Sequence, residues 1–199
     1  MQDRSVAADR QPTPLRQVRL WTPSILVHRG EGGVLYVEQD ESLPAWPRRI
    51  TEKLLEWAAR APERTLYADR GGPDGSWRRL AYGEAADGMR RLGQFLLDAG
   101  LSAERPLAIL SGNGVEHALL ALAAIHVGIP YAAVSPAYSL VSKDFGRLKS
   151  VFSTLRPGMV FAAEREPFET ALAAVADPAL PSLFARGAAR RDEEFAAAL

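Results

Sequence analysis

Short apolar runs that alternate with segments of helical length constrain the fold of this chain more than any other feature of its sequence. The apolar runs have the length of buried strands and are residues 106–110, 131–135 and 158–163. The segments that follow them have helical length and are residues 115–127, 142–155 and 167–176. Strands separated by whole helices are joined by right-handed crossovers and lie parallel in one sheet. The sequence therefore predicts an α/β fold, with a mainly parallel sheet and flanking helices.

Two hairpins and two amphipathic helices are predicted before this alternating region. Apolar runs around a glycine-containing turn indicate a β-hairpin over residues 25–37, and a second one over residues 65–80. A helix from Pro47 to Pro62 carries on one face Ile50, Leu54, Trp57, Ala58 and Ala61. A helix that follows Tyr82 and is capped by Gly100 carries on one face Ala85, Met89, Leu92, Leu96 and Ala99. The first hairpin is expected to precede the α/β subdomain.

The turn SGNG, residues 111–114, occupies the place where many nucleotide-binding proteins hold a phosphate, between a strand and a helix. A dinucleotide-binding turn would need a third glycine where this sequence has His117. A Walker-type loop would need a lysine after its last glycine, and none follows. We interpret the turn as a corner. Gly112 and Gly114 allow the bend, and Asn113 is expected to cap the helix.

The helix over residues 115–127 is apolar nearly all round, which predicts burial between sheets or subdomains. Its two histidines, His117 and His126, are nine residues apart and point to opposite sides of the helix. They cannot form a two-histidine metal site, and we interpret each as a packing residue. His28, in the first hairpin, has no obvious partner in the sequence.

The remaining candidate residues do not indicate a reaction. Acidic side chains at the start of a helix interact favourably with the helix dipole. This explains, without catalysis, the acids scattered at helix starts and in loops, which are Glu84, Glu116, Asp144, Glu164, Glu166 and Glu169. Lys143 and Lys149 are interpreted as surface residues. The chain has no cysteine, which excludes disulfides, thiolate metal sites and a cysteine nucleophile, and it has no G-x-S-x-G elbow. We therefore predict no catalytic, cofactor-binding or metal-binding residue.

Composition and the chain ends limit location and domain organisation. The 24 basic and 24 acidic residues balance, so no nucleic-acid or membrane partner is expected. Residues 1–15 are polar, are expected to be flexible, and lack the apolar core of a secretory signal. The longest apolar stretch is too short to span a bilayer, so a cytoplasmic location is expected. Residues 16–176 are assigned to one N-terminal α/β subdomain, and residues 177–199 to a truncated connecting segment.

Three stretches resemble the N-terminal part of adenylate-forming (AMP-binding) acyl-CoA synthetases. They are RRLAYGEAADGMRRLGQFLLDAGL, RPLAILSGNGVEHALLALAAIHVGIPYAAVSP and LKSVFSTLRPGMVFAA. The family's "TYxEL", "VAILLPNSPEF" and "AGAVYVPLNP" patterns correspond here to LAYGEA, LAILSGNGVEH and VGIPYAAVSP. This resemblance covers residues 46–176. Residues 134–152 and the early PLRQVRLWTPSILVHR are most similar to the feruloyl-CoA synthetase branch.

The resemblance implies a cytoplasmic ligase that activates a hydroxycinnamate-like carboxylate with ATP and Mg²⁺ and transfers it to coenzyme A. The family's catalytic groups lie in a Ser/Thr/Gly-rich loop ending in Lys, an aromatic-Gly-x-Thr-Glu motif, a ribose-binding Asp and a mobile C-terminal domain with a catalytic Lys. None of these occurs in the 199 residues, and Glu169, in FET, lacks the motif. We therefore expect an N-terminal fragment whose partner is the missing C-terminal portion, and which holds no cofactor and is inactive in isolation.

One departure from the family pattern concerns the start of the helix after residue 81. The family often has Thr or Ser before the Tyr of its "TYxEL" pattern, whereas this sequence has Ala81. Loss of a capping hydroxyl costs about 1 kcal/mol of helix stability.

Two alternatives to the fragment of a ligase remain open. The chain is alternatively a stand-alone α/β module that binds a nucleotide or another small ligand in the crevice at the carboxyl ends of its strands. Ser111–Asn113 and Ser135–Tyr138 would line that crevice. A non-catalytic remnant or split subunit is the other alternative, and it would expose an apolar face that a missing part covers.

Overall fold

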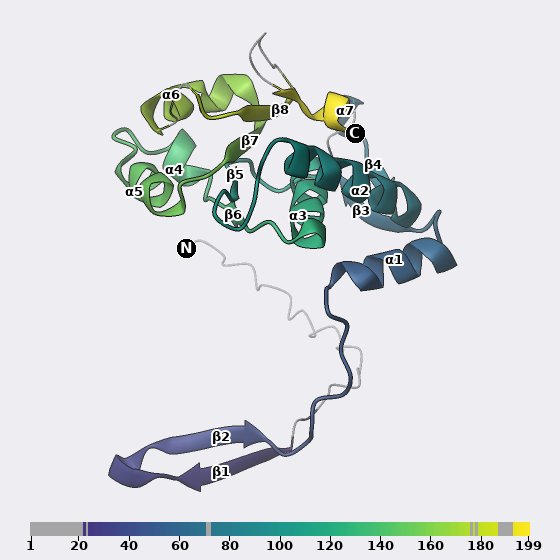
Figure 1. Cartoon of the computed structure of the whole chain (residues 1–199), viewed down its shortest axis with the longest axis vertical. Coiled ribbons are helices and arrows are strands. Elements are labelled where there is room, and N and C mark those ends of the chain that lie inside the picture. Colours follow the sequence, from purple (N-terminus) through teal and green to yellow (C-terminus); the bar gives the residue numbers. More distant parts are fainter. Residues whose placement is uncertain (1–21, 23, 71–72, 176, 178, 187–192) are drawn as a thin grey trace, which may run out of the picture. The chain divides into compact units, whose positions relative to one another are not determined.

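The computed structural model describes residues 22, 24–70, 73–175, 177, 179–186 and 193–199 (Figure 1). Two units divide the chain, Met1–Trp46 and Pro47–Leu199, and each is described by itself. The expected flexible segment, residues 1–15, lies outside the described residues. Within the described part of the chain, no helix is long and apolar enough to cross a membrane.

The first unit contains a β-hairpin, which confirms the hairpin predicted from the sequence. Strands β1 (Ile25–Arg29) and β2 (Leu35–Gln39) are antiparallel and are joined through the 3-10 turn η1 (Glu31–Gly33). The imidazole of His28 stacks on the ring of Tyr36 with centroids 5.1 Å apart, and its Nδ1 lies 3.6 Å from the Glu38 carboxylate. The sequence-based view that His28 has no partner is therefore wrong, because cross-strand neighbours are set by register.

The second unit alternates helices and strands. Its elements are α1 (Thr51–Arg60), β3 (Thr65–Asp69), η2 (Pro73–Gly75), β4 (Arg78–Ala81), α2 (Tyr82–Asp98), β5 (Leu107–Ile109), α3 (Val115–Val127), β6 (Tyr131–Ala133), α4 (Ala137–Leu140), α5 (Gly146–Leu155), β7 (Met159–Glu164), α6 (Arg165–Val175), β8 (Ser182–Arg186), β9 (Glu193–Glu194) and α7 (Phe195–Ala198). Strands β3 and β4 form the second predicted hairpin. Helix α5 begins four residues later than predicted, because Ser142 and the Asp144 carboxylate form a hydrogen-bonded turn before it.

The main sheet has the strand order β6-β5-β7-β8-β9, and all its neighbouring strands are parallel. This confirms the predicted α/β fold with a mainly parallel sheet and flanking helices. Strands β8 and β9 come from the segment after residue 176, for which the sequence predicted no strand. Strand β6 lies on one side of β5, and β7, which follows β6 in the sequence, lies on the other side of β5.

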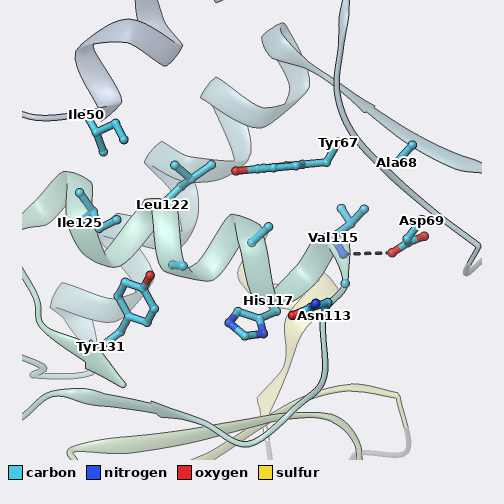
Figure 2. A pocket seen from close by; sticks show the side chains of 13 residues that line it. Ile50, Tyr67, Ala68, Asp69, Asn113, Val115, His117, Leu122, Ile125 and Tyr131 are labelled. Carbon is cyan, nitrogen blue, oxygen red and sulfur yellow. Dashed lines mark hydrogen bonds between the residues drawn. The ribbon is translucent and has the colours of Figure 1, made fainter. Parts of the chain in front are cut away.

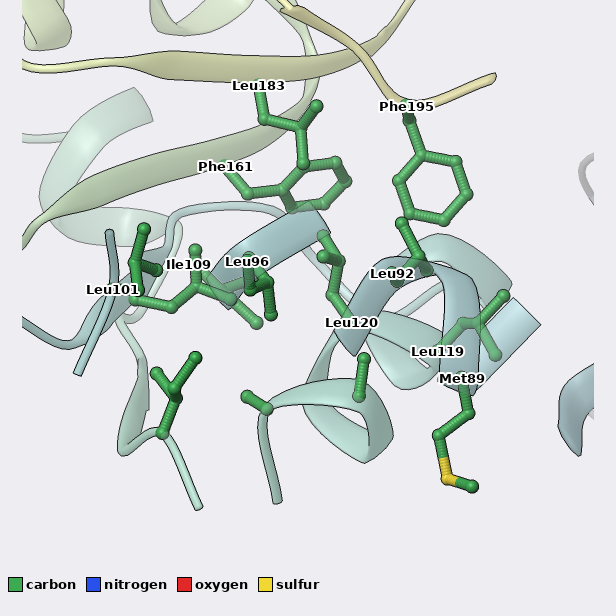
Figure 3. Close-up of a cluster of buried hydrophobic side chains, with 14 of the residues drawn as sticks. Met89, Leu92, Leu96, Leu101, Ile109, Leu119, Leu120, Phe161, Leu183 and Phe195 are labelled. Atoms are coloured by element: carbon green, nitrogen blue, oxygen red, sulfur yellow. The ribbon is translucent and has the colours of Figure 1, made fainter. Parts of the chain in front are cut away.

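Alternating side chains of the sheet pack into two hydrophobic clusters, one on each face. Helices α2 and α3 cover one face (Figures 1 and 3), where the buried strand residues are Leu107, Ile109, Met159, Phe161 and Leu183. Helices α5 and α6 cover the other, where the buried residues are Ala108, Val160, Ala162 and Phe184 of the strands and Leu110, which directly follows β5. Successive side chains of each strand point to opposite faces of the sheet and so contribute to both clusters. This is typical of a parallel sheet covered on both faces.

Helix α3 is buried on one side only. Its side chains Leu120, Ala123 and Ala124 are fully buried against α2 and the sheet. Its outer side carries Leu122 and Ile125, which are only half-buried. The sequence predicted that α3 is buried on all sides. Among the described residues, this is correct for the face that packs on α2 and the sheet, and wrong for the outer face.

Completing the cap of α2 should stabilise the second unit. The N–H of Ala81 donates to a Glu84 carboxylate oxygen at 2.8 Å, which is one half of a capping box. Alanine offers no oxygen to the backbone N–H three residues later, so we expect Ala81→Ser to raise the free energy of unfolding by about 1 kcal/mol. Urea unfolding followed by circular dichroism measures this change. The same substitution in a Glu84→Gln background serves as a comparison. An equal gain in both backgrounds would show that the serine hydroxyl and the Glu84 carboxylate, the two halves of the capping box, act independently.

Candidate functional site

A crevice at the carboxyl ends of the parallel strands is the first candidate site. It lies where β6 and β7 leave β5 on opposite sides, the position at which open α/β sheets commonly bind ligands. Its volume is about 330 Å³, and it is lined after β5 by Ser111, Gly112 and Asn113 and, from β7 and β8, by Ala163 and Arg186. The first three of these were predicted from the sequence to line the crevice, whereas Ser135–Tyr138, predicted with them, do not contribute to the lining.

The start of α3, at one wall of this crevice, is held by a carboxylate from another element. The Val115 N–H donates to Oδ2 of Asp69, at the end of β3, over 3.0 Å (Figure 2). The residue before the helix is Gly114, and no side chain from that position caps it. The predicted cap by Asn113 is therefore wrong. A long-range carboxylate carries a full negative charge and satisfies the helix N-terminus better than a neutral amide does.

Arg78, on β4, links that carboxylate to the helix. Its Nη2 lies 2.7 Å from Asp69 Oδ2 and 2.8 Å from Glu116 Oε2, and its Nη1 also donates to Glu116. Burial raises the pKa of the Glu116 carboxyl, but the hydrogen bond and positive charge of Arg78 outweigh burial and hold that pKa below its usual range. Hydrogen bonds to the two carboxylates raise the pKa of Arg78, so the guanidinium stays charged. We call these three residues the Arg78 cluster.

Sequence reasoning identified Glu116 only as an acid at a helix start and did not identify Asp69 or Arg78. The three residues come from β3, β4 and α3, so no local spacing connects them. The signal that could have found Arg78 is the hairpin register, which places it opposite Asp69.

The two histidines of α3 lie apart, as their spacing predicts. The Nδ1 of His117 lies 3.0 Å from the Gly112 carbonyl, at the crevice. At the other end of the helix, His126 Nδ1 lies 3.2 Å from the hydroxyl of Thr51, a fully buried residue of α1. No group of three metal-ligating side chains occurs among the described residues.

The other acids singled out in the sequence make local contacts. Glu164 pairs with Arg186 at 2.6 Å, and Glu169 pairs with Arg165 at 3.4 Å on α6. Asp144 accepts hydrogen bonds from the Gly146 N–H and from Ser142, and these lower its pKa. Lys149 donates to the Asp144 carbonyl. These contacts link neighbouring elements or hold turns, and none approaches the crevice except that of Arg186.

His126 should make the folded chain less stable at acidic pH than at neutral pH. Burial, together with the positive charges of Arg49 and Arg90, lowers the pKa of His126 below its ordinary value near 6.5. The unfolded chain therefore binds this proton more readily, and the stabilising contribution is present above about pH 6.5 and is lost as the pH falls through that value. Urea unfolding at pH 7.5 and 5.5 measures the loss. We expect His126→Gln to reduce the pH dependence, and an unchanged dependence would contradict this assignment.

The start of α3 does not fit the triphosphate of ATP. A phosphate at the start of α3 would meet the Asp69 carboxylate, which already occupies the helix N-terminus. Of the three arginines that line the crevice, Arg78 is bound by two carboxylates and Arg186 by a third, whereas Arg70 lies over the ring of Trp77. At the turn of residues 111–114, the N-terminus of α3 is therefore occupied by a carboxylate of the chain itself.

Comparison with known proteins places the fold. The chain superimposes on an acyl-CoA synthetase from Brucella canis with a TM-score of 0.58 and 23% identity, over 73% of this chain and 26% of that one. It superimposes on the luciferase-like enzyme of the mealworm Zophobas morio with a TM-score of 0.61 and 16% identity, over 87% of this chain and 38% of that one. The chain thus spans well under half the length of these structures. No curated protein shows significant similarity to it.

The sequence profile of a family described as AMP-binding enzymes matches residues 54–196, which is most of the chain and nearly the whole of the second unit. The matched region includes β5, the corner at residues 111–114, α3 and the parallel sheet, the elements on which the sequence resemblance to adenylate-forming enzymes depends. This chain belongs to the AMP-binding enzyme family.

Proposed function

We propose that this chain is the N-terminal part of an ATP-dependent acyl- or aryl-CoA ligase that acts in the cytoplasm. The match of the family profile to residues 54–196 is the observation that supports this proposal most directly. In the overall reaction, a carboxylate and ATP give an acyl-adenylate and pyrophosphate. The thiol of coenzyme A then displaces AMP to give the acyl-CoA thioester. The sequence resemblance to the feruloyl-CoA synthetase branch supports a hydroxycinnamate-like substrate.

The chain by itself is proposed to be inactive, with the remaining portion of the enzyme as its partner. The Arg78 guanidinium is already engaged by two carboxylates, so it is not available to a pyrophosphate leaving group. Stabilising that leaving group requires preorganised donors and a metal ion. The 199 residues contain no Ser/Thr/Gly-rich loop ending in lysine that would supply the donors.

Carboxylate-dependent exchange of pyrophosphate into ATP tests this proposal. We expect purified chain, shown by circular dichroism to be folded, to give no exchange above a mock preparation with ferulate, a fatty acid or acetate. Exchange above that background would contradict inactivity and would place the adenylation chemistry within these residues. Reading the source DNA beyond codon 199 tests the assignment to a ligase, because the proposal expects the reading frame to continue into the missing loop.

The crevice at the carboxyl ends of β5, β7 and β8 favours a second candidate, a module that binds a small ligand without catalysis. Under this proposal the crevice, about 330 Å³ in volume, would hold the nucleobase or the sugar of a nucleoside or nucleotide whose remainder extends to the surface. Calorimetric titration with adenosine and AMP tests it. Saturable heat with either compound supports a binding module, and flat titrations with both contradict it.

A further inference from the structure

A second and larger pocket lies on the outer side of α3, between that helix, the β3–β4 hairpin and the edge strand β6 (Figure 2). Its volume is about 500 Å³, within the range of small-molecule sites. The half-buried helix side chains Leu122 and Ile125 form one wall. Ile50 and the rings of Tyr67 and Tyr131 stand around them, and His117 and Asn113 lie together near the first turn of the helix. The pocket is therefore mainly apolar, with two aromatic rings and one polar end.

The carboxylate at the polar end of the pocket already has its partners. Asp69 is the one carboxylate among the thirteen described residues that line the pocket, and none of the thirteen is a lysine or arginine. The Asp69 carboxylate accepts from the Arg78 guanidinium and from the Val115 N–H. An anionic ligand would find no cation here, and a cationic ligand would compete with Arg78. Placing an unpaired charge against an apolar wall is costly, so the lining favours an uncharged ligand.

His117 adds a directional requirement. Its Nδ1 lies 3.0 Å from the carbonyl oxygen of Gly112, which can only accept a hydrogen bond. The neutral imidazole must therefore carry its proton on Nδ1, and its Nε2 is then an acceptor. A ligand that uses this nitrogen must bring its own donor, an O–H or N–H group.

We propose that this pocket binds an uncharged aromatic molecule that carries a hydrogen-bond donor, with a phenol as the simplest member of the class. The aromatic body packs between the two tyrosine rings and the apolar side of α3, where planar rings gain from offset or edge-to-face contacts. The hydroxyl donates to Nε2 of His117. This site is separate from the reaction proposed above, and its binding does not depend on ligase activity.

Saturation-transfer NMR on the full chain, with three matched probes, tests the proposal. We expect 4-methylphenol to bind saturably. We expect 4-methylanisole, which lacks the donor, to bind about fivefold more weakly, the effect of losing one neutral hydrogen bond. The anion 4-methylbenzoate should show no saturable binding, because the pocket offers no cation. Equal affinity for all three probes would overturn the proposal.

Two variants locate the binding, and a third serves as control. His117→Phe keeps an aromatic ring but removes the acceptor, so it should make the affinities for 4-methylphenol and 4-methylanisole equal. Ile50→Asp places a carboxylate on the wall at a side chain that is 67% exposed, so folding should be unaffected and binding of both probes weaker. Val141→Asp, on a side chain that is 76% exposed and outside the pocket, should change neither affinity.

Light scattering separates a ligand site from an interface between copies of the chain. A concentration-independent monomer mass supports the ligand site. Self-association that Ile50→Asp removes would show that a second copy covers this face and would overturn the proposal, as would probe binding that neither His117→Phe nor Ile50→Asp alters.

Discussion

Replacing Phe161 with alanine is expected to lower the free energy of unfolding by about 4 kcal/mol. Phe161 lies in β7, the strand hydrogen-bonded to both β5 and β8, and its side chain is completely buried. Its ring lies 6.0 Å from that of Phe195 in α7 and within the cluster formed with α2 and α3 (Figure 3). Both faces of the sheet are covered, so the surroundings cannot collapse into the cavity without moving a strand. Urea unfolding followed by circular dichroism measures the loss.

The size of this loss is a large share of the stability of a domain, which is typically about 5–15 kcal/mol. An exposed residue provides the control: Leu140→Ala, at a side chain that is 49% exposed, should change the free energy of unfolding by less than about 0.5 kcal/mol. Phe195→Ala tests whether α7 contributes to the same cluster. We expect the double variant to lose less than the sum of the single variants, because the two rings are in contact. A loss below about 1 kcal/mol for Phe161→Ala would contradict the central position of this ring.

The parts of the fold that local pattern decides were predictable from sequence. Strand β5 and helix α3 follow from an apolar run, a glycine-containing corner and a long apolar segment, and each occurs where predicted. Strand β8 was missed, because SLFAR is a short run between a proline and a glycine and its place is set by pairing with β7. The local pattern of apolar residues shows whether a segment can be buried. Whether that segment pairs as a strand depends on residues that are distant in the sequence.

The candidate sites were less predictable, for the same reason. Asn113 is a good local cap for α3, but Asp69 reaches the helix from β3 and takes that role. The apolar sequence of α3 indicates that all its sides can be buried, yet it does not say what covers each side. Leu122 and Ile125 consequently line a pocket that the sequence did not reveal. Both sites depend on the hairpin of β3 and β4, whose Asp69 and Arg78 side chains reach the start of α3 only through the tertiary fold.

The Arg78 cluster should account for the second large effect. Arg78→Ala removes the cation that Asp69 and Glu116 share, and it leaves two part-buried carboxylates beside one another at the start of α3. We expect the free energy of unfolding at pH 7 to fall by about 2 kcal/mol, below the value for a fully buried pair because the Arg78 side chain is 34% exposed. Arg78→Lys should recover only part of this, since an ammonium cannot donate to both carboxylates in the planar geometry of a guanidinium.

The pH dependence of the Arg78→Ala effect distinguishes lost charge pairing from lost packing. Because the folded-state pKa of Glu116 is depressed, its contribution is present above the unfolded value near 4.3 and is lost as the pH falls through the lower folded value. The difference between Arg78→Ala and the parent chain should therefore be largest near pH 7 and shrink toward pH 3, because the unfolded chain then takes up the proton that the paired Glu116 carboxylate resists. A difference that stays constant from pH 7 to pH 3, measured by urea unfolding, would assign the loss to the packing of the arginine stem. Glu116→Gln should shrink the difference already at pH 7, because it removes one of the two charges that Arg78 balances.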